Sequence, residues 1–402
     1  MRLVIGRGKT GNTKLVKQMN REGILYQLRQ HPRLSRAELS VRTKLSRPCV
    51  SSLVDEMIHE GLIHEVGTGE SKGGRKPILL EYNVQAYTVV GAVFEGSELE
   101  MAIADMKGEL LHHVHTRLEQ PVDGDSALEA LKTNLDTLLE KSGFGRDRVI
   151  GIGVGLPGIT QKRSGTVSYA PSTGWMNLPV GKEIEERLGL PVILDNDVNM
   201  MTMGEFYGGA GSGVSSLVYM YVGTGIGAGI IIDKQFYRGS KEAAGEIGYM
   251  LIGGDRLRRQ GEFGVFEKNY SVTGICDKAK AAGLTVDPGR SILRQLGEQA
   301  DQGSRQARTL LEDVYTHWAS GIANTVSVLD PELLILSGEM VHLSESGLAR
   351  IRELLGQWVP VLPDIQLAGL RERAGLLGAV HSVLEAFPSA QPARSSGSAG
   401  AD

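Results

Sequence analysis

A group of acidic and amide residues in the second half of the chain could bind hydroxyl groups or accept a proton. The run Asp195-Asn196-Asp197 follows an apolar segment typical of a strand, and ligand sites of open α/β sheets lie at the carboxyl ends of strands. A carboxylate there could be a general base or a hydrogen-bond acceptor, although Asp195 or Asn196 could instead cap the next helix. Glu246, which lies between two glycines, and Glu267 are further candidates, but they could also be an ordinary turn residue and a surface charge.

A glycine-rich turn, Gly223-Thr224-Gly225-Ile226-Gly227, separates two apolar runs that predict paired strands at 217–222 and 228–232. Consecutive backbone N–H groups in such a turn can hold an anion. The same glycines would also suit a tight hairpin that needs unusual backbone angles. The turn alone leaves both interpretations open.

The size and composition predict a cytoplasmic protein with more than one domain. The chain has 402 residues, more than the ~250–300 at which single cores stop growing. Its longest apolar runs are far shorter than the ~20 residues of a membrane helix, and its first residues do not resemble a signal peptide. Only two cysteines occur, Cys49 and Cys276, which argues against a disulfide framework or a structural zinc cluster.

The charges are unevenly distributed along the chain. Residues 1–80 contain 15 Lys and Arg against 7 Asp and Glu, whereas the remaining residues contain 28 basic and 40 acidic side chains. A basic N-terminal segment joined to an acidic body favours contact with a polyanion such as DNA.

The N-terminal segment has the pattern of a winged helix-turn-helix. Apolar spacing predicts helices over 12–30, after Ser35 and over 47–60, and Ser35 with Glu38 predicts a capping box. Two further segments, 62–66 and 78–82, can pair as a wing around a basic loop. A small dimerisation domain with a basic surface is the alternative. The residues predicted to contact DNA lie at the starts of the second and third helices and in the wing loop, and they are Ser35, Arg36, Ser46, Arg47, Cys49, Ser51, Ser52, Arg75 and Lys76.

Strands and helices alternate through the rest of the chain, which predicts an α/β body. The predicted strands are 88–94, 99–105, 110–116, 149–156, 192–194 and 333–336, and the predicted helices are 126–141, 181–188, 197–206 and 374–386. The segment from Pro388 onward is rich in Ser, Ala and Gly and is predicted to be disordered.

Both parts of the chain resemble the ROK family. The N-terminal segment is similar to the winged helix of ROK repressors, above all xylose repressors. The blocks GIGVGLPG, LDNDVN, VGTGIGAGIIID, YRGSKEAAGEIG and DPELLILSG resemble the sugar-binding body of the family. The resemblance implies an α/β fold with a winged helix-turn-helix at 1–82, an actin-like (ribonuclease H-like) two-lobed body at 83–387 and a tail at 388–402. It divides the body into a small lobe of 83–195 plus about 372–387 and a large lobe of 196–371.

The resemblance also implies a sugar site. An Asn-Asp pair, the Glu of the GEIG block and a later Glu bind sugar hydroxyls in this family, which assigns those roles to Asn196, Asp197, Glu246 and Glu267. Asp197 matches the catalytic base of the family kinases. Tyr249 replaces a His that family members use on the sugar, and its phenol can still form a hydrogen bond with a hydroxyl.

The chain departs from the family kinases at their phosphate and zinc sites. Their ATP-binding Asp-x-Gly-Gly-Thr turn matches 93–97, where Val93 replaces the Asp and Glu95 would repel phosphates by about 4 kcal/mol at ~4 Å. Their later Gly-Gly nucleotide turn is Gly338-Glu339 here. The zinc ligands of the family fall on residues that bind zinc poorly, namely Tyr249, Arg258, Gln260 and Val265.

These features predict a sugar-responsive transcriptional regulator, a repressor of carbohydrate genes, that is not an enzyme and uses no cofactor or metal. Its expected partners are operator DNA, a small sugar effector and further copies of itself in a homodimer or homotetramer, without a membrane. Two alternatives remain open: a sugar kinase with a DNA-binding head, and a regulator whose body only oligomerises.

Overall fold

Three helices and a small sheet form the head, which comprises residues 13–70 and 76–82. The computed structural model describes residues 13–70, 76–119, 123–170, 175–252, 263–371 and 373–387. The helices of the head are α1 (Thr13–Gln30), α2 (Arg36–Thr43) and α3 (Arg47–His59). The predicted capping box is confirmed, because Ser35 Oγ accepts a hydrogen bond from Glu38 N and the Glu38 carboxylate accepts one from Ser35 N. Ser46 Oγ caps α3 in the same way by accepting a hydrogen bond from Cys49 N at 3.4 Å.

The predicted wing is also present. Strands β1 (Leu34–Ser35), β2 (Ile63–Thr68) and β3 (Ile78–Tyr82) form a sheet in the order β1-β3-β2, and β2 and β3 are antiparallel. The tip of the wing, 71–75, lies outside the described residues, and with it the predicted contact residue Arg75.

The first sheet of the body has five strands in the order β11-β7-β4-β5-β6. These strands are β4 (Thr88–Glu95), β5 (Glu98–Ala104), β6 (Leu110–Arg117), β7 (Val149–Leu156) and β11 (Val192–Asn196). Every residue of β7 is buried, because α4 (Gly124–Ser142) and α5 (Val180–Leu188) cover one face of the sheet and α12 (Arg373–Ala386) covers the other. A short sheet of β8 (Ile159–Gln161), β9 (Thr166–Ala170) and β10 (Trp175–Leu178) extends from this region.

The second sheet has the order β14-β13-β12-β15-β16. Its strands are β12 (Leu217–Val222), β13 (Ile226–Ile232), β14 (Gln235–Phe236), β15 (Leu333–Gly338) and β16 (Asp364–Leu367). Alternate side chains of β12 point to opposite faces. Val218 and Met220 pack against the helical layer of α7 (Val265–Tyr270), α8 (Val272–Ala281), α9 (Ile292–Asp301), α10 (Arg305–Leu329) and α11 (Glu345–Trp358), whereas Leu217 and Tyr219 pack against α6 (Asp197–Gly208).

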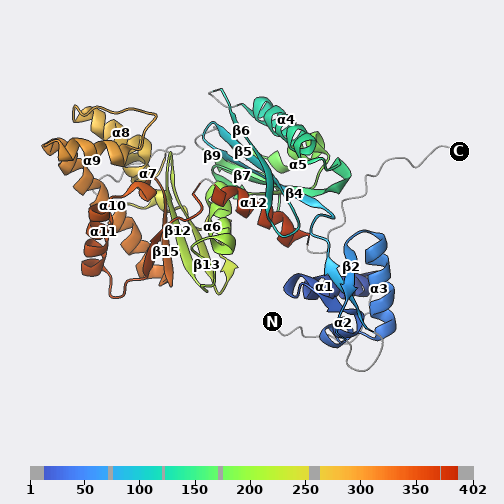
Figure 1. Cartoon of the computed structure of the whole chain (residues 1–402). Helices are drawn as coiled ribbons and strands as arrows, with labels where there is room; N and C mark the ends of the chain where they lie inside the picture. The colour runs from blue at the N-terminus through green and yellow to red at the C-terminus, as the bar shows by residue number, and fades with distance from the viewer. Residues whose placement is uncertain are drawn as a thin grey trace.

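Helices α6 and α12 pack against each other in the middle of the body, where the two sheets meet (Figure 1). Their backbones approach so closely that only glycine fits at the crossing. A Cβ atom on Gly378 would lie 1.7 Å from the carbonyl oxygen of Met200, and one on Gly204 would lie 1.9 Å from that of Ala374. The two-lobed α/β body predicted from the sequence is therefore confirmed, with this helix pair at its centre.

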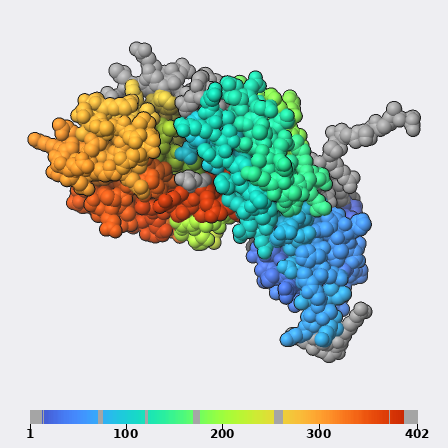
Figure 2. Space-filling view, turned by 45° about the horizontal axis from the view of Figure 1, so that its top comes forward, coloured from blue at the N-terminus to red at the C-terminus, as the bar shows by residue number. Residues whose placement is uncertain are grey.

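The head projects from one end of the body, and the two share a hydrophobic core (Figure 2). Residues Ile24, Leu28 and Tyr82 of the head belong to the same buried cluster as Val380 and Val383 of α12. The domain boundaries at 82 and 387 and the division of the lobes at 195 and about 372 stay predictions, and the predicted tail at 388–402 lies outside the described residues. No helix in the described parts of the chain is both long and apolar enough to cross a membrane.

Candidate functional site

A cavity of about 420 Å³ is lined by residues from both sheets. Its walls come from the end of β4, the start of α6, the turn between β12 and β13, and the segment that leads into the 3-10 helix η2 (Ile247–Tyr249). All five residues predicted to contact a sugar line it: Asn196, Asp197, Glu246, Tyr249 and Glu267. The volume lies within the range of about 300–1,000 Å³ that is usual for small-molecule sites.

Asn196 and Asp197 lie at the junction between β11 and α6. Asn196 caps the helix, since its Oδ1 accepts a hydrogen bond from Asn199 N at 3.1 Å, and its Nδ2 donates to the carbonyl of Gly158 at 2.9 Å. The capping interpretation of Asn196 is therefore confirmed, although an amide retains further hydrogen-bonding capacity for a ligand. Burial raises the pKa of Asp197 to about 8, and the charges of Glu95 and Glu246 act in the same direction.

Glu246 and Glu267 enter the cavity from the second sheet and its helical layer. Burial raises the pKa of Glu246 to about 7, and the negative charge of Glu267 contributes to this shift. Burial also raises the pKa of Glu267, although its Oε2 accepts a hydrogen bond at 2.8 Å from Ile226 N. Carboxyl groups that titrate near neutral pH can donate as well as accept hydrogen bonds, which suits a ligand with several hydroxyl groups.

The glycine-rich turn is a tight β-hairpin in which two N–H groups are already engaged. Gly223 N donates to Gly225 O at 2.8 Å, and Ile226 N donates to the carboxylate of Glu267. An anion bound there would compete with this carboxylate. Of the two interpretations left open by the sequence, the hairpin describes the turn as it is folded.

The start of α3 presents several of the predicted DNA contacts to solvent. Ser46, Arg47 and Ser52 are exposed, and so is Lys76 beside the wing. Cys49 and Ser51 are half-buried on the same helix. Their role in binding DNA stays a prediction.

Two predicted DNA contacts are engaged within the head instead. Ser35 is 5% exposed, and its hydroxyl belongs to the capping box of α2. Arg36 Nη1 lies 2.7 Å from Asp55 Oδ1, and its Nη2 lies 3.4 Å from Glu65 Oε1. In this conformation Ser35 caps α2, and Arg36 forms ion pairs with residues of α3 and β2. Arg36 would have to leave these ion pairs to contact DNA.

Comparisons with known proteins agree with both parts of the structure. The model of the ROK family matches residues 91–386, and the winged helix-turn-helix DNA-binding model matches residues 20–64. The chain belongs to the ROK family. The xylose repressor of Caldicellulosiruptor bescii is 30% identical over 393 residues, which cover 93% of this chain and 97% of the repressor. A glucokinase of Halalkalibacterium halodurans is 28% identical over 309 residues, which cover 72% of this chain and 92% of the kinase.

A solved structure has the same fold over nearly the whole chain. The crystal structure of a ROK family transcriptional regulator, a homologue of the E. coli Mlc protein, aligns with a TM-score of 0.76 at 23% identity. The alignment covers 93% of this chain and 97% of that one. The head and the two-lobed body are thus arranged within one chain in that ROK protein as well.

This ROK protein carries a carboxylate, Glu95, at the position that matches the first glycine of the kinase Asp-x-Gly-Gly-Thr turn, whereas the second glycine is kept as Gly96. Glu95, at the end of β4, lines the cavity and accepts a hydrogen bond from the phenol of Tyr221. Burial and the charge of Glu95 raise the pKa of Tyr221 far above its usual range. Val93, at the position of the kinase Asp, is 5% exposed and packs against Met200 and Ala379.

The later nucleotide turn is also altered in this ROK protein. Glu339 Oε1 accepts hydrogen bonds from Leu293 N at 2.8 Å and from the hydroxyl of Ser291. The carboxylate therefore lies at the N-terminus of α9, where it satisfies a backbone N–H group that lacks a partner within the helix. Nucleotide phosphates would meet negative charge at both turns.

Two of the four positions that match the ROK zinc ligands can be described. Tyr249 lines the cavity, and Val265, the first residue of α7, is buried at 5% exposed. Arg258 and Gln260 lie outside the described residues. In the described parts of the chain, no group of three or more His, Cys, Asp and Glu side chains is arranged to hold a metal ion.

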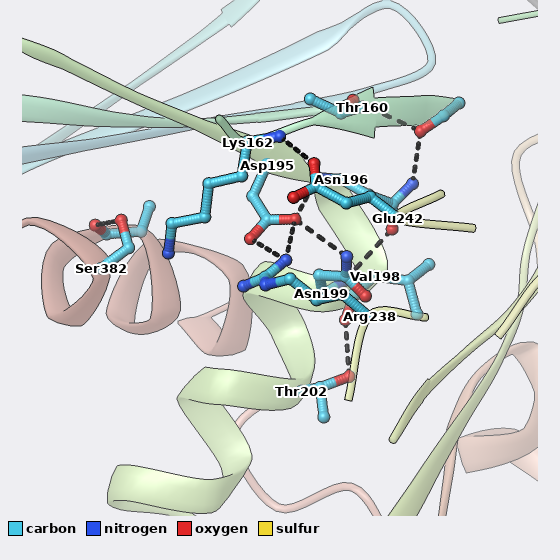
Figure 3. Close-up of polar contacts among 12 residues, drawn as sticks. Thr160, Lys162, Asp195, Asn196, Val198, Asn199, Thr202, Arg238, Glu242 and Ser382 are labelled. Carbon is cyan, nitrogen blue, oxygen red and sulfur yellow. Dashed lines mark hydrogen bonds and ion pairs between the residues drawn. The ribbon is translucent and has the colours of Figure 1, made fainter. Parts of the chain in front are cut away.

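Sequence reasoning missed a polar cluster beside the cavity (Figure 3). Arg238 forms an ion pair with Asp195, and Glu242 accepts a hydrogen bond from Lys162 N. Each pair joins a residue near the first sheet to one in the segment after β14. The sequence signals were the acid in the run at 195–197 and the block YRGSKEAAGEIG, which contains Arg238 and Glu242 but does not indicate a partner for either residue.

Proposed function

We propose that this ROK protein is a sugar-responsive transcriptional regulator that represses carbohydrate catabolic genes from the cytoplasm. Its head, which we place at 1–82, would bind operator DNA, and its body, at 83–387, would bind an effector sugar between two lobes. The observation that carries the proposal is one cavity, lined from both sheets by five hydroxyl-binding side chains, in a chain that also has an exposed helix-turn-helix. The similarity to a xylose repressor along 93% of the chain supports the same function and makes D-xylose the first ligand to test.

The cavity favours an uncharged, unphosphorylated sugar. Its lining includes six acidic side chains, which are Glu95, Asp197, Glu242, Glu246, Glu267 and Asp277. The basic residue in the lining is Lys268. A phosphate on the ligand would be repelled by these carboxylates. Sugar hydroxyls, in contrast, can donate to carboxylates and accept from protonated carboxyls.

Catalysis of phosphoryl transfer is the main alternative, because a glucokinase is among the relatives. Such transfer depends on positioning the phosphates and a metal ion. Glu95 and Glu339 place negative charge at both nucleotide turns, and Val93 offers no metal ligand. These features support a regulator rather than an enzyme.

The test is a thermal-shift screen of the full-length chain against D-xylose, D-glucose and other unphosphorylated sugars, followed by operator titrations. A ligand of the native state must raise the melting temperature. We expect one sugar to do so and to change operator affinity. A coupled assay with ATP and the same sugars should show no turnover, and turnover would support the kinase. If no sugar raises the melting temperature, a body that only oligomerises is the better description.

A further inference from the structure

The segment 237–246, which we call the strap, connects β14 to η2 and contacts both sheets. At its two ends it is fixed to β13, because Tyr237 N donates to Ile230 O at 2.8 Å and Ala228 N donates to Gly245 O at 2.8 Å. Glu246, one of the cavity carboxylates, is the last residue of the strap. The position of that carboxylate therefore depends on how the strap is held.

An ion pair joins the strap to the first sheet (Figure 3). Arg238 Nη1 lies 2.6 Å from Asp195 Oδ2 and 2.8 Å from Asp195 Oδ1. Asp195 is fully buried, at 0% exposed, and the side chain of Arg238 is 19% exposed. The guanidinium also lies over the ring of Phe236, 4.6 Å from its centre, which fixes its orientation.

The carboxylate of Asp195 is held by more than the arginine. Its Oδ1 accepts hydrogen bonds from Asn196 N and from Asn199 Nδ2, both at 2.8 Å. Both donors belong to the junction that carries Asn196 and Asp197 into the cavity. The carboxylate of Asp195 thus holds the junction that carries Asn196 and Asp197 on one side of the cavity. Through Arg238 it also holds the strap, which carries Glu246 on the other side.

A second contact crosses between the lobes in the same direction. Glu242, which lines the cavity, accepts a hydrogen bond from Lys162 N, just after β8. Glu242 has a positive φ of 55°, a conformation that non-glycine residues rarely adopt unless their surroundings hold them in it. Two independent contacts therefore hold the strap, one to the first sheet and one to the residue that follows β8 of the small sheet.

We propose that Arg238 and Asp195 are positioning residues for the ligand: their ion pair holds the strap across the two sheets and thereby sets Glu246 in the same cavity as Asn196 and Asp197. Neither residue of the pair lines the cavity. The proposal rests on the proposed function only for the identity of the ligand, since the connection between the sheets exists without it. A ligand that contacts both walls would bind to a cavity whose shape this ion pair has already fixed.

The test compares Arg238→Gln and Arg238→Lys with the wild type as full-length chains. The control is Arg350→Gln in α11, which removes ion pairs with Glu312 and Glu353 at a residue that does not line the cavity. Hydrogen exchange of the strap is measured without ligand, and binding of D-xylose and D-glucose is measured by calorimetry. We expect faster exchange at 237–246 in Arg238→Gln and sugar affinity lower by roughly tenfold or more, as is typical when the support of a binding residue is lost. Arg238→Lys should retain part of the protection of the strap against exchange and part of the sugar affinity. In both variants, operator affinity without sugar should be unchanged.

Two results would overturn the proposal. The first is that Arg238→Gln leaves the hydrogen exchange of the strap unchanged. The second is that exchange of the strap becomes faster while sugar affinity stays the same, because the ion pair would then only stabilise a loop. If neither sugar binds the wild type, the proposed function is what fails, and the exchange data alone decide whether the ion pair holds the strap. Should Arg238→Gln not fold, the double variant Asp195→Asn/Arg238→Gln replaces it, since it leaves no unpaired buried charge.

Discussion

Asp197 combines a place in the cavity wall with a strongly shifted pKa, so it is the residue at which ligand binding should be most sensitive to charge. Asp197→Asn keeps the shape of the side chain but removes the ionisable group. We expect operator affinity without sugar to be nearly unchanged and the sugar response to be lost. In the wild type that response should be some 5–150-fold, the usual size of such couplings.

The measurement is a titration of operator DNA with and without the sugar found in the screen. Asp301→Asn, an exposed residue at the end of α9, is the matched control and should respond like the wild type. Linkage requires that operator DNA weaken sugar binding by the same factor. A full sugar response in Asp197→Asn would remove this residue from the site.

The shifted carboxyls also predict how stability depends on pH. Because the folded state raises the pKa of Asp197 to about 8 and that of Glu246 to about 7, it binds more protons than the unfolded state above about pH 4. Each group therefore lowers the free energy of unfolding of the unliganded protein as pH rises, by up to about 1.4 kcal/mol per pH unit. This loss ends near pH 8 for Asp197 and near pH 7 for Glu246.

Urea unfolding at several pH values would check this. Asp197→Asn should gain stability relative to the wild type as pH rises from 5 to about 8, and the gain should then level off. A constant difference between Asp197→Asn and the wild type across this range would contradict the assigned shift.

Arg47 is the exposed cation on the first turn of α3, the end of the helix that meets DNA in this motif. Arg47→Ala should weaken specific operator binding by about 1–3 kcal/mol if the side chain reads a base. If it contacts a phosphate, binding should weaken similarly on all sequences, with a shallower dependence on salt. Gel-shift titrations at several salt concentrations separate the two, with the exposed Arg294→Ala of α9 as control. Unchanged affinity at low salt would exclude Arg47 from the interface.

The cavity residues that were predicted from the sequence are those that belong to a family motif. Asn196, Asp197, Glu246, Tyr249 and Glu267 were assigned from family blocks, and they line one cavity. Arg238 was missed because its partner is 43 positions away on another sheet, and no local pattern records such a contact. Ser35 was assigned to DNA from its place at a helix start, the same place that makes it a buried cap.

At the scale of elements, apolar runs predicted the central strands of the body, and helical spacing of apolar residues predicted the helices of the head. β7 was predicted with its exact bounds, because all of its residues are buried and apolar or glycine. The small sheet β8-β9-β10 and the edge strand β16 were not predicted, since strands of three to five residues contain too little pattern. Edge strands also depend on neighbours that the sequence does not identify.

The crossing of α6 and α12 should tolerate no side chain at its glycines. Gly378→Ala would place a Cβ atom 1.7 Å from the backbone oxygen of Met200, so the helices must separate. We expect a loss of about 1–3 kcal/mol in the free energy of unfolding, even though alanine favours helices. The control is Gly297→Ala in α9, where nothing lies within 4 Å of the added atom. That variant should gain up to about 1 kcal/mol. Equal effects of the two substitutions in denaturant unfolding would contradict the close packing.

At the scale of the whole molecule, one head offers few DNA contacts, so tight operator binding calls for two. We expect a homodimer on a palindromic operator with half-sites about 34–36 Å apart or a multiple of that distance. Sedimentation of the full-length chain with and without operator, together with footprinting, would check this. A homotetramer of two such dimers would also agree, whereas a monomer at micromolar concentration in both conditions would not.

The core shared by the head and α12 has a consequence for synthesis on the ribosome. The head leaves the ribosome before α12, but its buried cluster includes Val380 and Val383 of that helix. The nascent head therefore lacks part of its packing until α12 has been translated. Chains cut short before α12 would carry a head with exposed apolar surface, a form that proteases and chaperones recognise. Premature termination should thus leave few fragments able to occupy the operator without sensing sugar.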